Sequence, residues 1–220
     1  MGVRRTLRYT RRVSEPRNRS RGQTSPDRLI AAAIAIVDRD GVDGLTIRRL
    51  GDACGVTPMA VYRHFRDKDE LLDHVVDAVL ADLATQELTG SWREQIVELV
   101  WSARATLLDH PGMAALCVHR PTPVSAVARF YDRAIAALEA GGYSADQAIL
   151  GSDALLMFLF GSVLWETPRT GTEPRSLLAP TAVPEARDIL AQAETVGRRD
   201  PEEYFASGLG LLLDGLERAR

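Results

Sequence analysis

The stretch of sequence that decides the fold is "LTIRRLGDACGVTPMAVYRHF", residues 45–65. Thr46 can cap a short helix that ends at Gly55, because a hydroxyl accepts one of a helix's first backbone N–H groups and glycine adopts the left-handed conformation that ends many helices. Thr57 can cap a second helix that has Pro58 at its first position. Two helices joined by a tight turn through glycine are typical of a helix-turn-helix unit, and we predict one here.

The second helix of this stretch has two faces of different chemistry. Val61 and Phe65 lie four residues apart, so we expect them to share a face that packs inward, with Ala60 beside them. The opposite face carries groups that fit a DNA groove, because arginine pairs with a guanine edge, proline and methionine contact a thymine methyl group, and tyrosine hydrogen-bonds a phosphate. That face consists of Pro58, Met59, Tyr62 and Arg63.

Groups that flank the second helix extend the predicted contact with DNA. Backbone amides at a helix start bind phosphate oxygens, and basic side chains stand near both helices. Any one of these side chains alone could be an ordinary surface residue, but the full set favours nucleic acid. The predicted DNA-binding residues are Thr46, Arg48, Arg49, Thr57, Pro58, Met59, Tyr62, Arg63, His64 and Lys68.

The charges of the chain are divided unevenly along its length. Residues 1–66 contain 14 arginines, no lysine and six acidic residues, whereas residues 67–220 contain 13 basic and 24 acidic residues. The first segment therefore suits a polyanionic partner and the second does not. Residues 1–22 hold eight arginines and one glutamate. We predict that they form a flexible basic arm that contacts phosphates or the minor groove, although such an arm could also serve only for solubility.

Helical periodicity dominates the remaining sequence and predicts an all-α fold with enough apolar residues for a substantial core. A first helix should begin with Ser25 as cap and Pro26 at its first position and end at Gly41. A long helix from Asp67 to about Gln86 should link two domains. Further helices are predicted at 92–109, 111–118, 123–140, 144–167, 184–197 and 201–219.

Cysteine content and hydropathy favour a cytoplasmic protein. Cys54 and Cys117 are too few for a disulfide framework, and no signal peptide opens the chain. The most apolar run, residues 154–165, is shorter than the roughly 20 residues that span a bilayer, so we expect a core helix and no membrane partner. His110, Cys117 and His119 are metal-binding types of residue, but a fourth ligand with suitable spacing is absent from the sequence. We therefore predict no metal site and no cofactor.

The stretch "GVDGLTIRRLGDACGVTPMAVYRHFRDKDELL", residues 41–72, resembles the TetR family of transcriptional regulators. The marks of the family are the Gly-Leu-Thr start, the "GVT" turn, "YRHF" with a lysine shortly after it, and the final "LL". The resemblance implies a homodimer with three N-terminal helices on DNA and an all-α, ligand-responsive domain behind them. It divides the chain into a DNA-binding domain at 23–68 and a ligand-binding and dimerisation domain at 69–220.

A weaker resemblance, to the C-terminal domain of the tetracycline repressors, covers residues 91–123 and 141–166. Where those repressors have a magnesium-ligating imidazole, this chain has Leu116. Where they place polar groups that contact the drug, the aligned residues are Ala84, Leu99 and Ala103. The resemblance therefore implies a small-molecule effector that is more apolar than magnesium-tetracycline.

The expected effector pocket lies between the linking helix, the 92–109 and 144–167 helices and the 111–123 segment. Apolar residues at helical spacing can equally form plain core, and an arginine can cap a helix, so each residue has both interpretations. The predicted effector-binding residues are Leu99, Trp101, Ala103, Leu107, Leu116, His119, Arg120, Met157, Phe160 and Trp165.

The sequence thus predicts a ligand-responsive repressor that binds a palindromic double-stranded DNA operator as a dimer. The apolar faces of 144–167 and 201–219 should form the dimer. The effector should shift 111–123 against the linking helix and change the spacing of the two recognition helices. One alternative is a sequence-nonspecific DNA-binding protein that uses the arginine-rich arm. An all-α enzyme is a weaker alternative, because the sequence shows no nucleophile–base pair, phosphate-binding glycine loop or paired carboxylates, and hence no catalytic residues.

Overall fold

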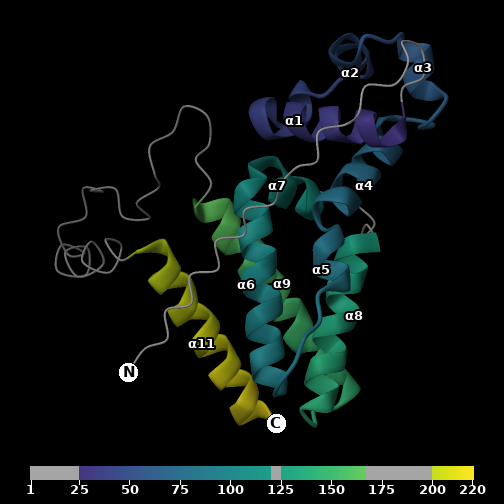
Figure 1. Ribbon diagram of the computed structural model, residues 1–220. Helices are drawn as coiled ribbons and strands as arrows, with labels where there is room; N and C mark the ends of the chain where they lie inside the picture. Colours follow the sequence, from purple (N-terminus) through teal and green to yellow (C-terminus); the bar gives the residue numbers. More distant parts are fainter. Residues whose placement is uncertain (1–24, 120–124, 167–199) are drawn as a thin grey trace, which may run out of the picture.

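The computed structural model describes residues 25–119, 125–166 and 200–220, and every regular element within these ranges is an α-helix, as predicted. Three helices form one end of the molecule and a bundle of mostly longer helices forms the rest (Figure 1). The predicted helix at 184–197 and the basic arm at 1–22 lie outside the described residues. The helices are α1 (Pro26–Gly44), α2 (Ile47–Cys54), α3 (Pro58–Tyr62), α4 (Lys68–Val79), α5 (Ala81–Thr85), α6 (Trp92–Asp109), α7 (Pro111–His119), α8 (Ser125–Ala140), α9 (Ala145–Glu166) and α11 (Pro201–Ala219).

Helix α1 begins as the sequence predicts but continues beyond its predicted end. The Ser25 hydroxyl accepts a hydrogen bond from the Arg28 backbone N–H at 3.3 Å, and Pro26 occupies the first turn. Gly41 has a left-handed φ of 73° and interrupts the helical geometry. One further turn nevertheless follows, up to Gly44, because the glycine tolerates the kink without ending the helix.

The helix-turn-helix forms between α2 and α3, as predicted. The Thr46 hydroxyl caps α2 by accepting from the Arg49 N–H at 3.1 Å, and Gly55 ends α2 with φ 69°. The inner face of α2 uses Cys54 and leaves Ala53 exposed. Thr57 has the extended backbone of a cap residue, but its side chain makes no capping hydrogen bond, so that part of the prediction was wrong.

The linking helix is not continuous, in contrast to the prediction for residues 67–86. Helix α4 ends at Val79, and α5 starts after a break at Leu80. The break turns both Leu80 and Leu83 into the core, where their exposed fractions are 5% and 6%. Arg133 of α8 donates hydrogen bonds to carbonyl groups at the end of α5, including that of Leu83 at 2.5 Å. These bonds satisfy carbonyls that a helix end leaves without partners.

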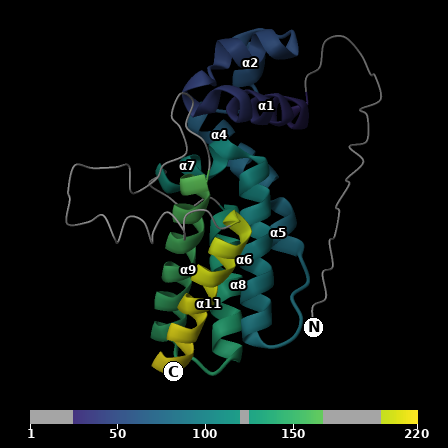
Figure 2. The same cartoon turned by 90° about the vertical axis from the view of Figure 1, so that its left-hand side faces the viewer.

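The larger part of the molecule is a helical bundle around α9. Helix α9 packs against α6, α7, α8 and α11, and Figure 2 shows α11 running beside it. A Cβ atom at Gly208 of α11 would lie 2.7 Å from the Phe158 ring of α9, so glycine is needed for this close approach. The α6 and α11 boundaries coincide with the predicted ones, α7 extends one residue beyond its predicted end, and α9 begins one residue later than predicted. The predicted start of the 123–140 helix and the predicted end of the 144–167 helix lie outside the described residues.

Helix α9 is longer than the apolar run that marks it in the sequence. With 22 residues it has the length and composition that could cross a membrane, whereas the 12-residue run at 154–165 alone would not. Within this fold one side of α9 forms core, with Leu155, Leu159 and Val163 almost fully buried. Its other side exposes Leu150 and Met157, so the prediction of a core helix holds for one face only.

Candidate nucleic-acid interface and ligand groove

Helix α3 presents a mixed surface to solvent while its other side anchors it to the core. Val61 and Phe65 are 0% and 2% exposed, as the spacing of the two residues predicts. Met59 and Tyr62 on the opposite side are 68% and 48% exposed. Apolar surface of a methionine and a tyrosine that remains in water does not contribute to folding stability. The position of these two side chains therefore favours contact with a partner over a role in stability.

The residues around α3 complete an outward-facing group. Thr57, Pro58, Arg63 and His64 are exposed, as are Thr46 and Arg48 at the start of α2. Among the described residues, neither Arg48 nor Arg63 forms an ion pair or side-chain hydrogen bond. Their guanidinium groups are therefore available to phosphates or base edges.

Two of the predicted DNA-binding side chains are instead engaged within the protein. Arg49 donates to the Asp40 carboxylate at 2.6 Å and to the Gly44 carbonyl at 3.1 Å. The hydrogen bond from Arg39, with a smaller contribution from Arg49, lowers the pKa of Asp40. Lys68 donates its Nζ to the Val42 carbonyl at 3.0 Å and ties the start of α4 to the end of α1. Both cations thus fix the α1–α2 corner.

The turn between α2 and α3 depends on Gly51. A Cβ atom at this position would lie 2.7 Å from the Val56 carbonyl oxygen, which belongs to rigid backbone. The Val56 N–H in turn donates to the Gly51 carbonyl at 2.9 Å. This close approach sets the angle between the two helices and therefore the direction in which the outer face of α3 points.

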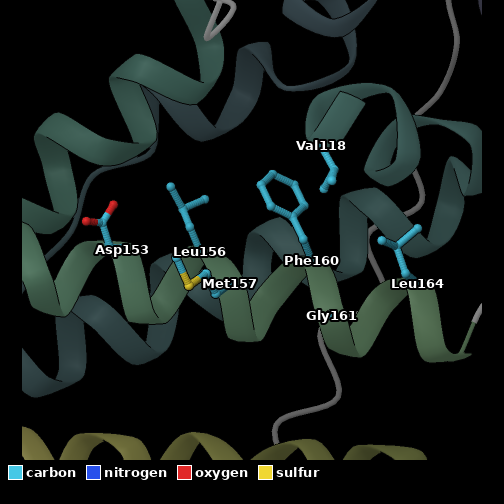
Figure 3. Close-up of a pocket in the computed structure, with 7 residues that line it drawn as sticks. All are labelled: Val118, Asp153, Leu156, Met157, Phe160, Gly161 and Leu164. Carbon is cyan, nitrogen blue, oxygen red and sulfur yellow. The ribbon is translucent and has the colours of Figure 1, made fainter. Parts of the chain in front are cut away.

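A groove lies in the helical bundle, between α9 and α7. Its volume is about 450 Å3. Figure 3 shows Asp153, Leu156 and Phe160 projecting from one side of α9, with Val118 of α7 pointing down toward them. The lining residues are Val118, Asp153, Leu156, Met157, Phe160, Gly161 and Leu164.

Of the eight predicted effector-binding residues whose side chains the structure describes, two line this groove, namely Met157 and Phe160. Leu99, Ala103, Leu107 and Leu116 are at most 5% exposed and belong to the core, so the structure supports the plain-core interpretation of these four. Trp165 is 40% exposed but lies outside the groove lining. The side chains of His119 and Arg120 lie outside the described part of the chain.

Trp101 belongs to a different cluster, between α6, α9 and α11. Its ring packs edge-on against Phe205 with centroids 5.0 Å apart. Arg104, only 5% exposed, lies over both rings and forms a 2.6 Å ion pair with Glu166. A buried guanidinium needs such a partner, so this cluster fastens the end of α9 to α6 and α11.

The sequence-based selection missed Asp153, Leu156, Gly161 and Leu164, although a signal for them exists. Residues 153, 156, 157, 160, 161 and 164 share one side of a helix by their spacing of three and four. The predicted set took most of its residues from α6 and α7, where they belong to the core, whereas the groove lies mainly on one side of α9. Asp153, the carboxylate next to the apolar run, marks that side.

Asp153 is held in place by Tyr131 of α8. The Tyr131 hydroxyl donates a hydrogen bond to Oδ1 of Asp153. Burial, together with this carboxylate, raises the pKa of Tyr131 to about 12, so the hydroxyl keeps its proton at neutral pH. The pair therefore presents a fixed carboxylate at one end of an apolar groove.

The three N-terminal helices and the bundle are joined by specific contacts at α7 and α4. His110 Nδ1 and Asp38 Oδ2 of α1 are 2.8 Å apart. Next to this pair, a Cβ atom at Gly112 would lie 2.6 Å from Cγ1 of Val37. The carboxylate of Asp77, on α4, accepts hydrogen bonds at the start of α8 from the Ala126 backbone N–H, at 2.7 Å, and from the Ser125 hydroxyl.

Family models match most of the chain. The model described as "Bacterial regulatory proteins, tetR family" matches residues 29–75. The model described as "Tetracyclin repressor-like, C-terminal domain" matches residues 84–220. The first match covers the helix-turn-helix and the second covers the bundle with the groove.

Two curated relatives show similarity over much of the chain. A Saccharopolyspora erythraea HTH-type transcriptional regulator is 34% identical over 70% of this chain, and the match spans 65% of that relative. The class A tetracycline repressor protein of transposon 1721, from Escherichia coli, is 30% identical over 89% of this chain and 91% of its own.

Solved structures resemble the fold closely. A possible TetR family transcriptional regulator of Streptomyces coelicolor has a TM-score of 0.78 at 26% identity, over 89% of this chain and 100% of its own. ActR of the same organism, in complex with actinorhodin, has a TM-score of 0.72 at 26% identity, over 89% and 98%. BioQ, in complex with its double-stranded DNA operator, has a TM-score of 0.65 at 28% identity, over 88% and 98%.

Proposed function

Because this chain belongs to the TetR family of bacterial transcriptional regulators, we propose that it represses transcription as a homodimer on a palindromic operator, which it leaves when a small, largely apolar effector binds. It is a DNA-binding regulator and not an enzyme. The observation that carries the proposal is the outer face of α3, where Met59 and Tyr62 are exposed on a helix whose inner face is fully packed.

The DNA contact is proposed to centre on α3 in the major groove. Pro58 and Met59 would contact thymine methyl groups, and Arg63 would pair with a guanine edge. Thr46, Arg48 and the N–H groups at the start of α2 would bind phosphate. The solved structure of BioQ contains operator DNA, which supports this use of the fold. Arg49 and Lys68 would contribute charge near the backbone while they hold the α1–α2 corner.

Dimerisation is proposed to cover the exposed apolar sides of α9 and α11. Leu150 and Trp165 are exposed on α9, Tyr204 and Leu211 are exposed on α11, and none of these four residues lines the groove. Apolar residues that recur along two neighbouring helices favour a partner surface, and a second copy can supply the same pair of helices by two-fold symmetry. Two recognition helices would then face one side of the dimer and read two half-sites.

The effector is proposed to bind in the groove along α9. The groove has the size of sites that take small organic molecules and is lined mainly by apolar side chains. The complex of ActR with actinorhodin supports a small-molecule effector for this fold. Leu116 stands in the core where the tetracycline repressors have a metal ligand, so the proposal involves no magnesium-tetracycline and no cofactor.

The signal is proposed to pass from the groove through α7 to α1 as well as to α4. Val118 lines the groove on α7, and the same helix begins at the His110–Asp38 and Gly112–Val37 contacts. An effector that displaces Val118 would move α7 as one rigid helix. Because Gly112 has no room for displacement toward Val37, the movement would reorient α1 and thus the recognition helix.

The test is binding of the purified protein to its own upstream DNA at two salt concentrations, with random DNA as competitor. A protected palindrome that survives the competitor supports the proposal. Equal affinity for random DNA, lost together at higher salt, would contradict it and favour nonspecific binding through the arginine-rich arm.

A further inference from the structure

Among the described residues that line the groove, Asp153 is the one charged side chain. The other described lining residues carry no ionisable side chain. Among the described residues, no arginine, lysine or histidine forms an ion pair with Asp153. A carboxylate beside apolar walls is costly unless something compensates its charge. Tyr131 compensates in part, through a single hydrogen bond to one oxygen.

The geometry around Asp153 favours a cationic partner over a neutral or anionic one. The Tyr131 hydrogen bond orients the carboxylate but adds no positive charge, so the groove keeps a net negative charge. Phe160 projects from the same side of α9 as Asp153 (Figure 3). Its ring lies about two helical turns from the carboxylate, so it offers an apolar surface to the uncharged part of a ligand whose charge lies at Asp153. Residues 67–220 also carry 24 acidic against 13 basic residues, and this excess raises the local concentration of cations.

We infer that the effector groove binds an apolar organic cation, with its charge at Asp153 and its hydrocarbon part along Leu156, Phe160 and Val118. This inference rests on the proposed function for the location of the effector, and it adds the chemical class of the ligand. Tyr131 acts as a positioning residue that fixes the carboxylate. An anionic effector is disfavoured by the same charge.

The experiment uses two probes of equal shape. One is a naphthylmethyl trimethylammonium ion, and the other is the neutral hydrocarbon in which carbon replaces the nitrogen. Each is titrated into the full-length protein without DNA, and binding is followed by naphthyl fluorescence. We expect the cation to bind about tenfold more tightly than the hydrocarbon, because only the cation gains from a nearby carboxylate of low solvent exposure.

Asp153→Asn removes the charge and keeps the size of the side chain. It should weaken binding of the cation about tenfold and leave the hydrocarbon unchanged, which also shows that the groove is intact. Asp132→Asn on α8 is the matched control. Asp132 is exposed and lies outside the groove lining, so this variant changes the net charge equally and should not alter binding of either probe.

Tyr131→Phe separates the positioning role from a structural one. It keeps the ring and removes the hydroxyl, so binding of the cation should change severalfold while the thermal unfolding temperature and binding of the hydrocarbon stay the same.

Equal affinity for both probes would overturn the inference, as would an unchanged affinity of the Asp153→Asn variant for the cation. Failure of both probes to bind would overturn it as well, because the groove would then not accept an apolar organic ligand of this size. Operator binding is measured in parallel on the same proteins. A failure there concerns the proposed function alone, since the titrations contain no DNA.

Discussion

The two ends of this molecule expose apolar residues in different ways. On α3 the exposed side chains are a few residues of one short helix, held by a tight turn and by the buried Val61 and Phe65. On α9 and α11 they recur along 22 and 19 residues of helix. A short, rigidly set patch suits a fixed partner such as a DNA groove. A long apolar side suits a helical partner and an adaptable ligand site.

A matched pair of core truncations tests whether the two ends are independent. Leu50 and Leu155 are both fully buried, so Leu50→Ala and Leu155→Ala should each cost about 2–5 kcal/mol. We expect Leu50→Ala to abolish specific operator binding while the dimer persists, and Leu155→Ala to lower the unfolding temperature of the whole bundle. Calorimetry and DNA binding measure the two effects. Full operator affinity of the Leu50→Ala variant would show that α2 is not required for the DNA-binding surface.

Two arginines of the DNA-facing end provide a second comparison. Arg63→Ala should weaken operator binding by about 1–3 kcal/mol and relax the preference at one base pair in each half-site. Arg49→Ala should weaken binding to all sequences alike, because Arg49 holds Asp40 and Gly44 at the α1–α2 corner, next to the recognition helix α3. Binding to a library of single-base variants of the operator distinguishes them. A loss of affinity for random DNA as large as for the operator would remove Arg63 from base recognition.

The junction between the two ends can be tested with a double-mutant cycle. Asp38→Asn and His110→Gln each interrupt the 2.8 Å contact between α1 and the start of α7. Each should destabilise the protein by about 1 kcal/mol, and the double variant should cost little more than either single variant. Denaturant unfolding gives the coupling energy, and operator affinity shows whether the contact affects DNA binding. Additive costs would indicate that the two residues act separately.

The smallest expected effects come from the two threonine caps. Thr46→Ala removes a hydrogen bond to the Arg49 N–H and should cost about 1 kcal/mol. Thr57→Ala should lower the free energy of unfolding by only a few tenths of about 1 kcal/mol, because the Thr57 side chain makes no capping hydrogen bond. Thermal unfolding in the absence of DNA compares them. Equal destabilisation would show that the Thr57 hydroxyl forms a cap in solution.

Local chemistry explains why the DNA-facing end is predictable from sequence. Thr46, Gly55 and Pro58 act on neighbouring backbone only, and Val61 and Phe65 follow from helical spacing. The ligand end depends on packing between distant helices. The linking helix breaks at Leu80, where Leu80 and Leu83 turn into the core, and Arg133 binds carbonyl groups at the end of α5. These contacts with distant helices are not visible in the local sequence. For the same reason, periodicity places Leu99 and Leu107 on a buried face but does not tell core from pocket.

The division of α3 into a packed and an exposed side has a consequence for how such a protein diversifies. After duplication of its gene, changes at the exposed positions would cost little folding stability, because Val61, Phe65 and the Gly51 turn anchor the helix from its other side. A copy could acquire a new operator while it kept the same sensor. Changes in the groove along α9 would have the opposite effect: the effector specificity would change and the operator would stay the same. The architecture thus lets the two specificities evolve separately within one chain.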